Sequence, residues 1–216
     1  MAAAARSAVA VEAPASPEAV TRASLRDDPR LVVSRAALEM FVDDGSTSAT
    51  VQQIAGAVGI STRTFYRYFA AKEDVVLPVL RRSTGVILAA LDDSSGDAAL
   101  LDRLVSALLV EVDGGRLNER QRAFLRIVAT TPAYRDRWLQ MDQTLHAALV
   151  RLMKAELAPG SDDFTARLGA DLVLGAARTA LDHWVVDPAP GSVEVLLRRS
   201  LQVVLRGLGL RSDPEA

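Results

Sequence analysis

The sequence contains no cysteine, which excludes a disulfide framework and any metal or redox site built on thiolates. Aromatic residues make up only 5% of the 216 residues, whereas half are apolar and Ala, Leu, Val and Arg are abundant. This composition favours helices over strands. No stretch approaches 18 uncharged apolar residues, so we expect no membrane-spanning segment and a cytoplasmic location. The histidines, His146 and His183, are too few and too far apart to indicate a metal site.

A short helix is predicted directly after Thr50. Thr50 is a good N-cap, and Gln53 three positions later completes a capping box. Apolar residues then follow at helical spacing and turn one side of the helix inward: Val51, Ile54, Ala55 and Val58. Gly59 stands where the chain must turn through a left-handed conformation. These signals predict a helix that ends in a tight turn.

A second short helix is predicted after Ser61, which can cap it. Its Phe65 and Phe69 lie one turn apart and point back toward the first helix. The residues left on the outside are polar, basic or aromatic: Thr62, Arg63, Thr64, Tyr66, Arg67 and Tyr68. Arginine can bind guanine O6 and N7 through two hydrogen bonds, threonine can contact base edges or phosphate, and tyrosine hydroxyls suit phosphate. The pair has the pattern of a helix-turn-helix that binds DNA.

Acidic residues are missing from residues 45–72, although the whole chain carries a formal net charge of -2. The same stretch holds the cations Arg63, Arg67 and Lys72. The alternative is a helical hairpin in a globular core with a solvated outer face, but such a face usually mixes charges of both signs. A surface that faces phosphates excludes carboxylates, because they would oppose the counterion release that drives binding. The charge pattern therefore favours DNA.

The same residues resemble a known family. The segments RLVVSRAALEMF, TVQQIAGAVGIS and RTFYRYFAAKEDVV, between Arg30 and Val76, are similar to the N-terminal DNA-binding domain of tetracycline-repressor-like (TetR family) regulators. The aromatic second helix, followed by Lys72 and Glu73, is the most specific part of the match. Ala71 departs from the family pattern, which usually has a polar cap there.

The resemblance implies a role for individual residues. Thr50, Tyr66, Tyr68 and Lys72 would contact phosphates, and Thr62 to Thr64 would contact bases. Arg67 stands between the tyrosines and suits either phosphate or guanine. The full predicted DNA-binding set is Thr50, Gln52, Gln53, Thr62, Arg63, Thr64, Tyr66, Arg67, Tyr68 and Lys72.

Turn residues divide the rest of the chain into helices. Asp28 and Pro29 begin a helix that runs to Gly45. Another should run from Lys72 to about Leu91, bent or restarted at Pro78. Further helices are predicted at about 97–112, 117–130, 132–157, 162–186 and 192–208, and no alternating strand appears. We therefore expect an all-α protein of about nine helices, with an N-terminal three-helix helix-turn-helix domain and a C-terminal helical ligand-binding and dimerisation domain.

The expected domain boundaries follow from these elements. Residues 1–20 are predicted to be a flexible arm, because they lack the leucine-rich core of a secretory signal. Residues 21–71 form the DNA-binding domain, 72–210 the effector-binding and dimerisation domain, and 211–216 a C-terminal tail. The early arginines can reach the minor groove or the DNA backbone, as in other helix-turn-helix proteins, or the arm makes no contact: Arg6, Arg22 and Arg26.

The last two helices are candidates for a homodimer interface. The last helix has the clearest apolar stripe: Val193, Leu196, Leu197, Ser200, Leu201, Val204 and Leu208. The helix before it mixes leucines with small residues that let a neighbour approach: Leu168, Leu172, Gly175, Ala176 and Leu181. Either a four-helix dimer interface or an ordinary intrachain core would produce these stripes. The dimer is favoured because two recognition helices spaced about 34–36 Å apart read a palindrome.

Seven residues are predicted to line an effector pocket: Phe124, Trp138, Met141, Leu145, Leu174, Arg178 and Trp184. The aromatic, Met and Leu side chains suit an apolar ligand, and Arg178 suits an anionic head group. The alternative for each is an ordinary core role. The segments TTPAYRDRW and LDHW are similar to actinobacterial regulators that bind acyl-coenzyme-A-like ligands. This resemblance implies a hydrophobic or acyl-type effector.

Together these patterns predict a homodimeric, ligand-responsive repressor. It would bind a palindromic operator in double-stranded DNA and be released by its effector, with no cofactor and no catalytic residues. The alternative is an all-helical enzyme acting on a hydrophobic substrate, for which the sequence offers no phosphate-binding glycine loop, GxSxG or HExxH motif. A helical scaffold would leave the acid-free stretch unexplained.

Overall fold

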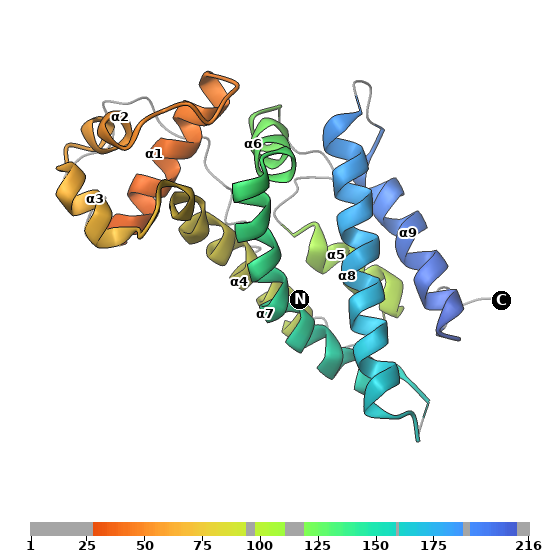
Figure 1. Cartoon of the computed structure of the whole chain (residues 1–216). Coiled ribbons are helices and arrows are strands. Elements are labelled where there is room, and N and C mark those ends of the chain that lie inside the picture. The colour runs from red at the N-terminus through yellow and green to blue at the C-terminus, as the bar shows by residue number, and fades with distance from the viewer. Residues whose placement is uncertain (1–27, 94–97, 111–118, 159, 188–190, 211–216) are drawn as a thin grey trace, which may run out of the picture.

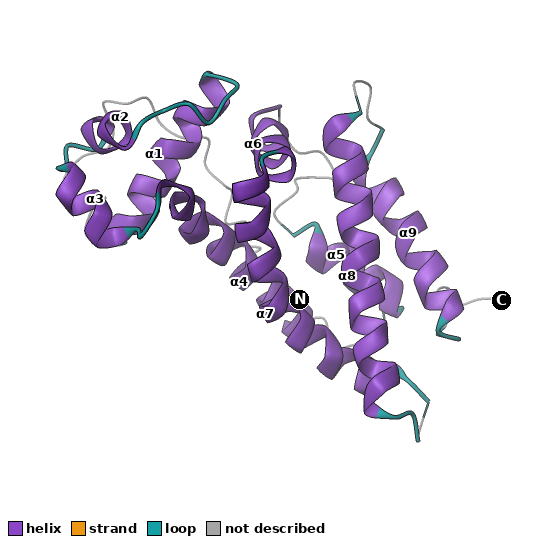
Figure 2. Ribbon diagram, viewed as in Figure 1, coloured by secondary structure: helices purple, strands orange, loops and turns teal. Residues whose placement is uncertain are grey.

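The computed structural model describes residues 28–93, 98–110, 119–158, 160–187 and 191–210. Within these ranges all regular secondary structure is helical, as Figure 2 shows, so the predicted all-α class is confirmed. The predicted arm at 1–20 and tail at 211–216 lie outside the described residues. No helix in the described ranges is long and apolar enough to cross a membrane.

Nine α-helices and one 3₁₀ segment follow one another along the described chain. They are α1 (Pro29–Asp43), α2 (Val51–Ala57), α3 (Thr62–Tyr68), η3 (Lys72–Val76), α4 (Leu77–Asp93), α5 (Leu100–Leu108), α6 (Glu119–Thr130), α7 (Pro132–Glu156), α8 (Asp163–Val186) and α9 (Val193–Gly207). The predicted helices agree with these bounds to within a few residues, except at the start of α4. There the chain forms the short 3₁₀ segment first, and Pro78 falls in the first turn of α4, where its missing N–H breaks no helical hydrogen bond. Pro78 therefore restarts the helix and does not bend it.

The helix starts predicted from the sequence are confirmed at the level of single hydrogen bonds. The Asp28 carboxylate accepts from the Arg30 N–H at 2.9 Å. Thr50 and Gln53 form the reciprocal capping box, in which the Gln53 N–H donates to the Thr50 hydroxyl at 3.2 Å and the Thr50 N–H donates to Gln53 Oε1 at 2.8 Å. Gly59 has φ 69°, as the turn between α2 and α3 requires. Local sequence signals thus set these boundaries.

The buried side chains form two cores at opposite ends of the molecule. The reader core packs α1, α2, α3, η3 and the start of α4, and consists of Val33, Ala36, Ala37, Leu38, Phe41, Ala49, Ile54, Ala55, Val58, Phe65, Phe69, Val75, Val76, Leu80 and Tyr134. The C-terminal core packs α4 to α9, and consists of Leu91, Leu100, Leu101, Leu104, Val105, Ala107, Leu109, Ala129, Leu145, Leu149, Met153, Ala166, Ala170, Val173, Leu174, Ala177, Ala180, Trp184, Val185, Val193, Leu197, Leu201 and Leu205. Figure 1 shows α1 to α3 at one end, α8 and α9 at the other, and α4 and α7 running between them.

Tyr134 of α7 is the member of the reader core that comes from farthest along the chain. Its ring is 1% exposed and lies 5.7 Å from the ring of Phe41 on α1. Its hydroxyl has no hydrogen-bond partner among the described residues. Burial, with the nearby Glu73 carboxylate, raises the pKa of Tyr134 to about 12. The reader core therefore extends past the predicted boundary at residue 71 and is completed by α7.

Replacing Tyr134 by phenylalanine should preserve the packing and remove a buried hydroxyl without a partner. We expect the free energy of unfolding at neutral pH to rise by about 1 kcal/mol. Because the pKa of Tyr134 in the folded state is raised from 10.0 to about 12, folding favours the protonated phenol, and the wild-type protein loses stability as the pH rises from 10 toward 12. Urea unfolding of Tyr134→Phe should lack this alkaline loss. Tyr66→Phe, which alters an exposed ring, serves as the control.

Candidate nucleic-acid interface

The outward face of α3 is held in place by the two phenylalanines behind it. Phe65 is 0% exposed and Phe69 4%, and their rings lie 5.0 Å apart in the reader core. Because a helix that buries one side must expose the other, Thr62, Arg63 and Arg67 are exposed. Ser61 accepts from the Thr64 N–H at 3.1 Å and so fixes the first turn. Thr62 and Arg63 of the predicted base-contacting segment therefore lie on the surface, whereas Thr64 is half-buried and its hydroxyl lies 3.0 Å from that of Ser61.

Aromatic residues flank the cationic side of α3. Tyr66 is 57% exposed, whereas Tyr68 is half-buried and packs against the reader core. The Arg67 guanidinium lies 5.3 Å from the centre of the Tyr68 ring, a cation–π contact. This contact holds a guanidinium and a phenol side by side. Both groups can donate to the same run of phosphates.

The start of α2 supplies the other exposed residues of the predicted set. Thr50, Gln52 and Gln53 are all exposed. The Gln53 carboxamide oxygen is already used, because it accepts from the Thr50 N–H and, at 2.9 Å, from the Thr50 hydroxyl. The Gln53 NH₂ group remains as a donor, and Gln52 keeps its whole amide. Gln53 therefore builds the helix start as well as belonging to this surface.

Lys72 has a structural role that the sequence did not indicate. Its side chain is half-buried, and its ammonium donates to the Thr47 carbonyl at 2.8 Å and to the Ala49 carbonyl at 3.4 Å. An ammonium carries three donors, so one is left for a phosphate. Besides its predicted phosphate contact, Lys72 therefore ties η3 to the segment that leads into α2.

Ala71 has no side chain that could cap η3, but its own backbone N–H is bound by a side chain of η3. The Ala71 N–H donates to Asp74 Oδ2 at 3.0 Å, which is the reverse half of a capping box. Asp74 Oδ1 in turn accepts from Arg137 Nε of α7 at 2.8 Å. An acidic residue three positions after Ala71 was a usable sequence signal for the first bond. No local sequence pattern predicts the bond between Arg137 and Asp74, because these residues lie 63 positions apart.

The predicted effector residues do not gather at one cavity. Leu145, Leu174 and Trp184 belong to the C-terminal core. Phe124 and Met141 pack against the reader core, and Trp138 packs against both cores. Trp184 is held by local contacts: its Nε1–H donates to the Gly191 carbonyl at 2.9 Å, and the Arg122 guanidinium lies 5.1 Å from the centre of its ring. The set is therefore divided between the two cores and the junction between them.

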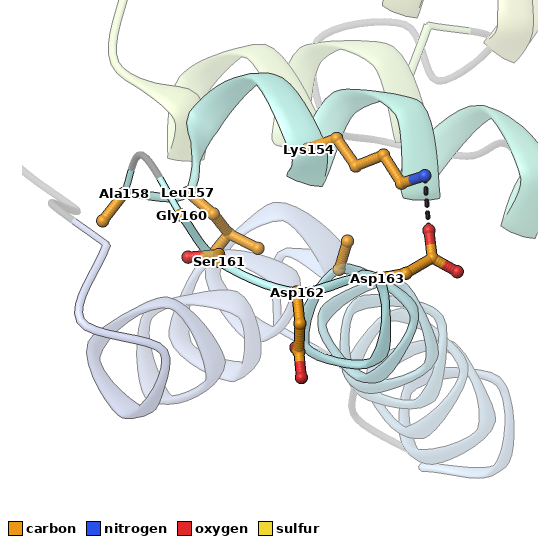
Figure 3. A pocket seen from close by; sticks show the side chains of 8 residues that line it. Lys154, Leu157, Ala158, Gly160, Ser161, Asp162 and Asp163 are labelled. Carbon is orange, nitrogen blue, oxygen red and sulfur yellow. Dashed lines mark ion pairs between the residues drawn. The ribbon is translucent and has the colours of Figure 1, made fainter.

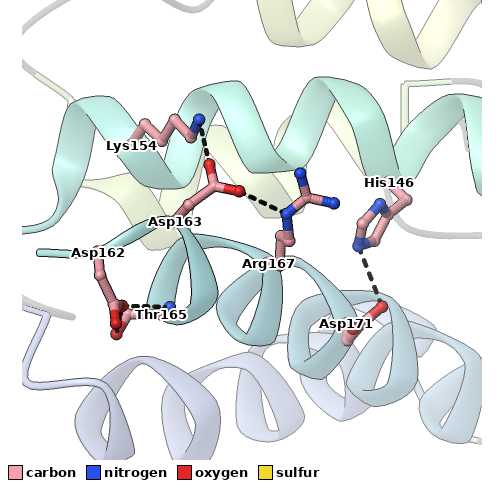
Figure 4. Close-up of polar contacts among 7 residues, drawn as sticks. All are labelled: His146, Lys154, Asp162, Asp163, Thr165, Arg167 and Asp171. Carbon is pink, nitrogen blue, oxygen red and sulfur yellow. Dashed lines mark hydrogen bonds and ion pairs between the residues drawn. The ribbon is translucent and has the colours of Figure 1, made fainter.

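Arg178 and Leu174 line an open recess between α7 and α8. It measures about 500 Å³ and is completed by Gln143, His146, Arg167, Asp171 and Gly175. Figure 4 shows the lining residues His146, Arg167 and Asp171. His146 Nε2 of α7 lies 3.1 Å from Asp171 Oδ1 of α8, and Arg167 Nε lies 2.6 Å from Asp163 Oδ2, outside the recess. The recess is therefore a polar surface feature, unlike the apolar pocket expected.

A second recess lies at the turn between α7 and α8, and Figure 3 shows it from close by. Lys154 pairs there with Asp163, the first residue of α8. The hydrogen bonds from Lys154 and Arg167 lower the pKa of Asp163 to about 2. This recess is lined by the turn and by the adjoining ends of α7 and α8, and it contains none of the predicted effector residues.

Comparisons with known proteins agree with this geometry. The family described as bacterial regulatory proteins, tetR family, matches residues 34–79, which span α1 to the start of α4. The HTH-type transcriptional regulator TcmR of Streptomyces glaucescens is 32% identical over 162 residues, which cover 69% of this chain and 70% of TcmR. The transcriptional regulator MftR of Mycobacterium tuberculosis is 27% identical over 165 residues, 76% of this chain and 83% of MftR.

The fold is also that of solved regulators. The structure of Thermus thermophilus FadR, described as a TetR-family transcriptional repressor in complex with lauroyl-CoA, superposes with a TM-score of 0.60 at 19% identity, over 87% of this chain and 98% of FadR. The helical fold and the acid-free α3 face together define a helix-turn-helix DNA-binding protein. The chain belongs to the TetR family of bacterial regulatory proteins and is a transcriptional regulator.

Two substitutions should separate base reading from backbone contact. Arg63 is exposed, so Arg63→Ala should weaken binding to the operator by about 1–3 kcal/mol and leave binding to random DNA and the fold unchanged. Lys72→Ala should weaken both kinds of DNA alike and also destabilise the fold by about 1–3 kcal/mol, because two carbonyls lose a charged donor. Titrations with both DNAs, together with urea unfolding, test this. Equal losses on both DNAs for Arg63→Ala would refute a base-reading role.

Proposed function

We propose that the protein is a homodimeric repressor that binds a palindromic operator and is released by a small hydrophobic or acyl-type effector. The observation that carries the proposal is the exposed, acid-free face of α3 above buried Phe65 and Phe69. Chromosomal DNA is the partner that this face suits, which agrees with the cytoplasmic location expected from the sequence. Family membership favours this function over the alternative of an enzyme acting on a hydrophobic substrate.

The proposed dimer surface consists of apolar side chains that α8 and α9 leave exposed: Phe164, Leu168, Leu172 and Val186 on α8, and Val195 and Val203 on α9. Phe164, Leu168 and Leu172 follow one another at intervals of four, so they share one face of α8. Val203 is 70% exposed. Large apolar side chains gathered on an exposed face typically mark an interaction surface. A second copy of the chain, related by a two-fold axis, would cover the same surface on both subunits.

The apolar stripe predicted on α9 packs within the chain. Val193, Leu197 and Leu201 are buried within the chain, and Leu196 and Val204 pack against the same C-terminal core. On α9 the proposed interface residues are therefore the exposed Val195 and Val203 in place of that stripe. On α8, Leu168 and Leu172 remain in the proposed surface.

We place the proposed effector site at the junction of the two cores. Trp138 and Met141 of α7 and Phe124 of α6 are all half-buried there, and all three belong to the predicted set. An apolar ligand that inserted between them would be covered by aromatic and Met side chains. The similar fold of FadR, described with lauroyl-CoA bound, supports an acyl-type ligand.

Release from DNA would follow from a difference in effector affinity between two arrangements. The effector would favour an arrangement in which α7 and α4 hold the two α3 helices at a spacing other than the operator's one helical turn, about 34–36 Å. Its effect on DNA affinity is limited to its preference for that arrangement, typically about 1–3 kcal/mol.

A gel shift of the full-length chain on the DNA upstream of its own gene, at two salt concentrations, tests the proposed function. We expect a complex on this DNA that persists at the higher salt, whereas the complex on random DNA disappears, because non-specific binding is almost wholly electrostatic. Equal retention of both DNAs would contradict the proposal. Adding acyl-coenzyme-A esters, fatty acids or aromatic compounds should release the specific complex.

The dimer predicts the effect of a charge placed on the proposed surface. Leu168→Asp or Val203→Asp should produce monomers at micromolar concentration in sedimentation experiments and abolish operator binding, since one recognition helix contacts too few bases. Val110→Asp, at an exposed valine just beyond α5 and outside the proposed surface, should remain dimeric. A monomeric wild-type chain at this concentration would contradict the dimer.

A further inference from the structure

The turn after α3 is held from two directions. We define this post-recognition turn as residues 70–76, between the end of α3 and the start of α4. On one side, Lys72 binds the carbonyls of Thr47 and Ala49 ahead of α2. On the other, Asp74 binds the Ala71 N–H and Arg137 of α7. The turn is therefore fastened both to the helix-turn-helix and to the C-terminal half of the molecule.

The ion pair between Arg137 and Asp74 is sheltered from solvent. The two side chains are 25% and 18% exposed, so water and salt screen the pair less than one at the surface. Tyr134, one turn earlier on α7, is buried in the reader core, and Trp138, the next residue, packs against both cores. The pair thus forms where α7 is already fixed by packing, which lowers the entropy cost of ordering the two side chains.

The hydrogen bond between Asp74 and the Ala71 N–H links the ion pair to the end of α3. Ala71 lies two residues beyond Phe69, the C-cap of α3, which is anchored in the reader core. Asp74 therefore connects the backbone at the end of the recognition helix to α7 through a single carboxylate. A shift of the first turns of α7 must either carry this turn along or break the pair.

We propose that Arg137 and Asp74 are positioning residues for DNA recognition, which lock the post-recognition turn onto α7 and so set the orientation of α3 relative to the C-terminal core. The proposal rests on the proposed function as an operator-binding regulator. The two residues act through α3 and not by touching DNA. Arg137 directly precedes Trp138 in α7, so an effector at the junction would act first on the helix that holds Arg137.

A double-mutant cycle tests the proposal on the full-length chain. The variants are Asp74→Asn, which keeps an oxygen to accept from the Ala71 N–H, Arg137→Gln, and the two together. Each is titrated against DNA that the wild type has selected from a random pool, and against random DNA, at one salt concentration. We expect each single variant to lower the ratio of specific to random affinity about five- to tenfold, and the double variant to lower it no further.

The two single variants change the net charge in opposite directions, which separates positioning from a long-range charge effect. If only charge mattered, Asp74→Asn would strengthen binding to both DNAs and Arg137→Gln would weaken it. Opposite shifts of this kind would overturn the proposal. So would an unchanged affinity ratio alongside lower stability, because the pair would then serve folding alone.

Arg103→Gln is the matched control, because it breaks a similarly sheltered pair, Arg103–Glu156, between α5 and α7 and away from the reader core. It should lower stability and leave the affinity ratio unchanged; an equal loss of that ratio would assign the effect to general destabilisation and overturn the proposal.

Hydrogen exchange without DNA provides an independent measurement. Amides of residues 62–76 should exchange faster in Asp74→Asn and Arg137→Gln but not in Arg103→Gln. If the wild type does not discriminate between DNAs, the proposed function fails, while the exchange data still decide whether the pair holds the turn; unchanged exchange in both variants would overturn the proposal.

Discussion

The continuous apolar stripe along α7 is the packing on which the rest of the structure depends. Tyr134, Trp138, Met141, Leu145, Leu149 and Met153 follow one another at intervals of three or four residues. Tyr134 completes the reader core, Trp138 contacts both cores, and Leu145, Leu149 and Met153 belong to the C-terminal core. Three short helices bury too little apolar surface to be stable by themselves, so the reader part gains stability from this helix. Because protein interiors are close-packed, a displacement of α7 in one core must be accommodated in the other.

The DNA-reading surface is a consequence of what the same helices bury. Phe65 and Phe69 fix the rotation of α3, and this leaves Thr62, Arg63 and Arg67 exposed on the opposite side. The free backbone N–H groups at the starts of α2 and α3 donate to capping side chains: Thr50 and Gln53 cap α2, and Ser61 caps α3. Rigid placement of exposed groups by buried neighbours is what a surface needs to match a fixed pattern of bases.

In the C-terminal half, the residues that pack in the core and those of the proposed dimer surface lie on different faces of α8 and α9. One face of α8 and one of α9 enter the C-terminal core, and the exposed face of each carries the apolar residues of the proposed dimer surface. Some charged side chains outside that surface pair across helices: Arg198 Nη1 lies 2.6 Å from Asp102 Oδ1, and Arg135 Nη2 lies 2.8 Å from Asp182 Oδ2. The proposed effector junction lies between the cores, where Trp138 and Met141 are half-buried. A ligand there would act on both halves at once.

Local interactions explain why so much could be predicted from the sequence. The capping box of Thr50 and Gln53, the turn at Gly59 and the inward direction of Phe65 and Phe69 all involve residues within a few positions of one another, so composition and spacing determine them. The tertiary structure alone decided the partners of Lys72, 23 and 25 positions away, and the bond between Arg137 and Asp74. It also decided that the apolar stripe of α9 packs within the chain, and it divided the predicted effector residues between two cores. The physical reason is that periodicity defines the face a helix buries, whereas the identity of the neighbour on that face depends on how distant segments pack.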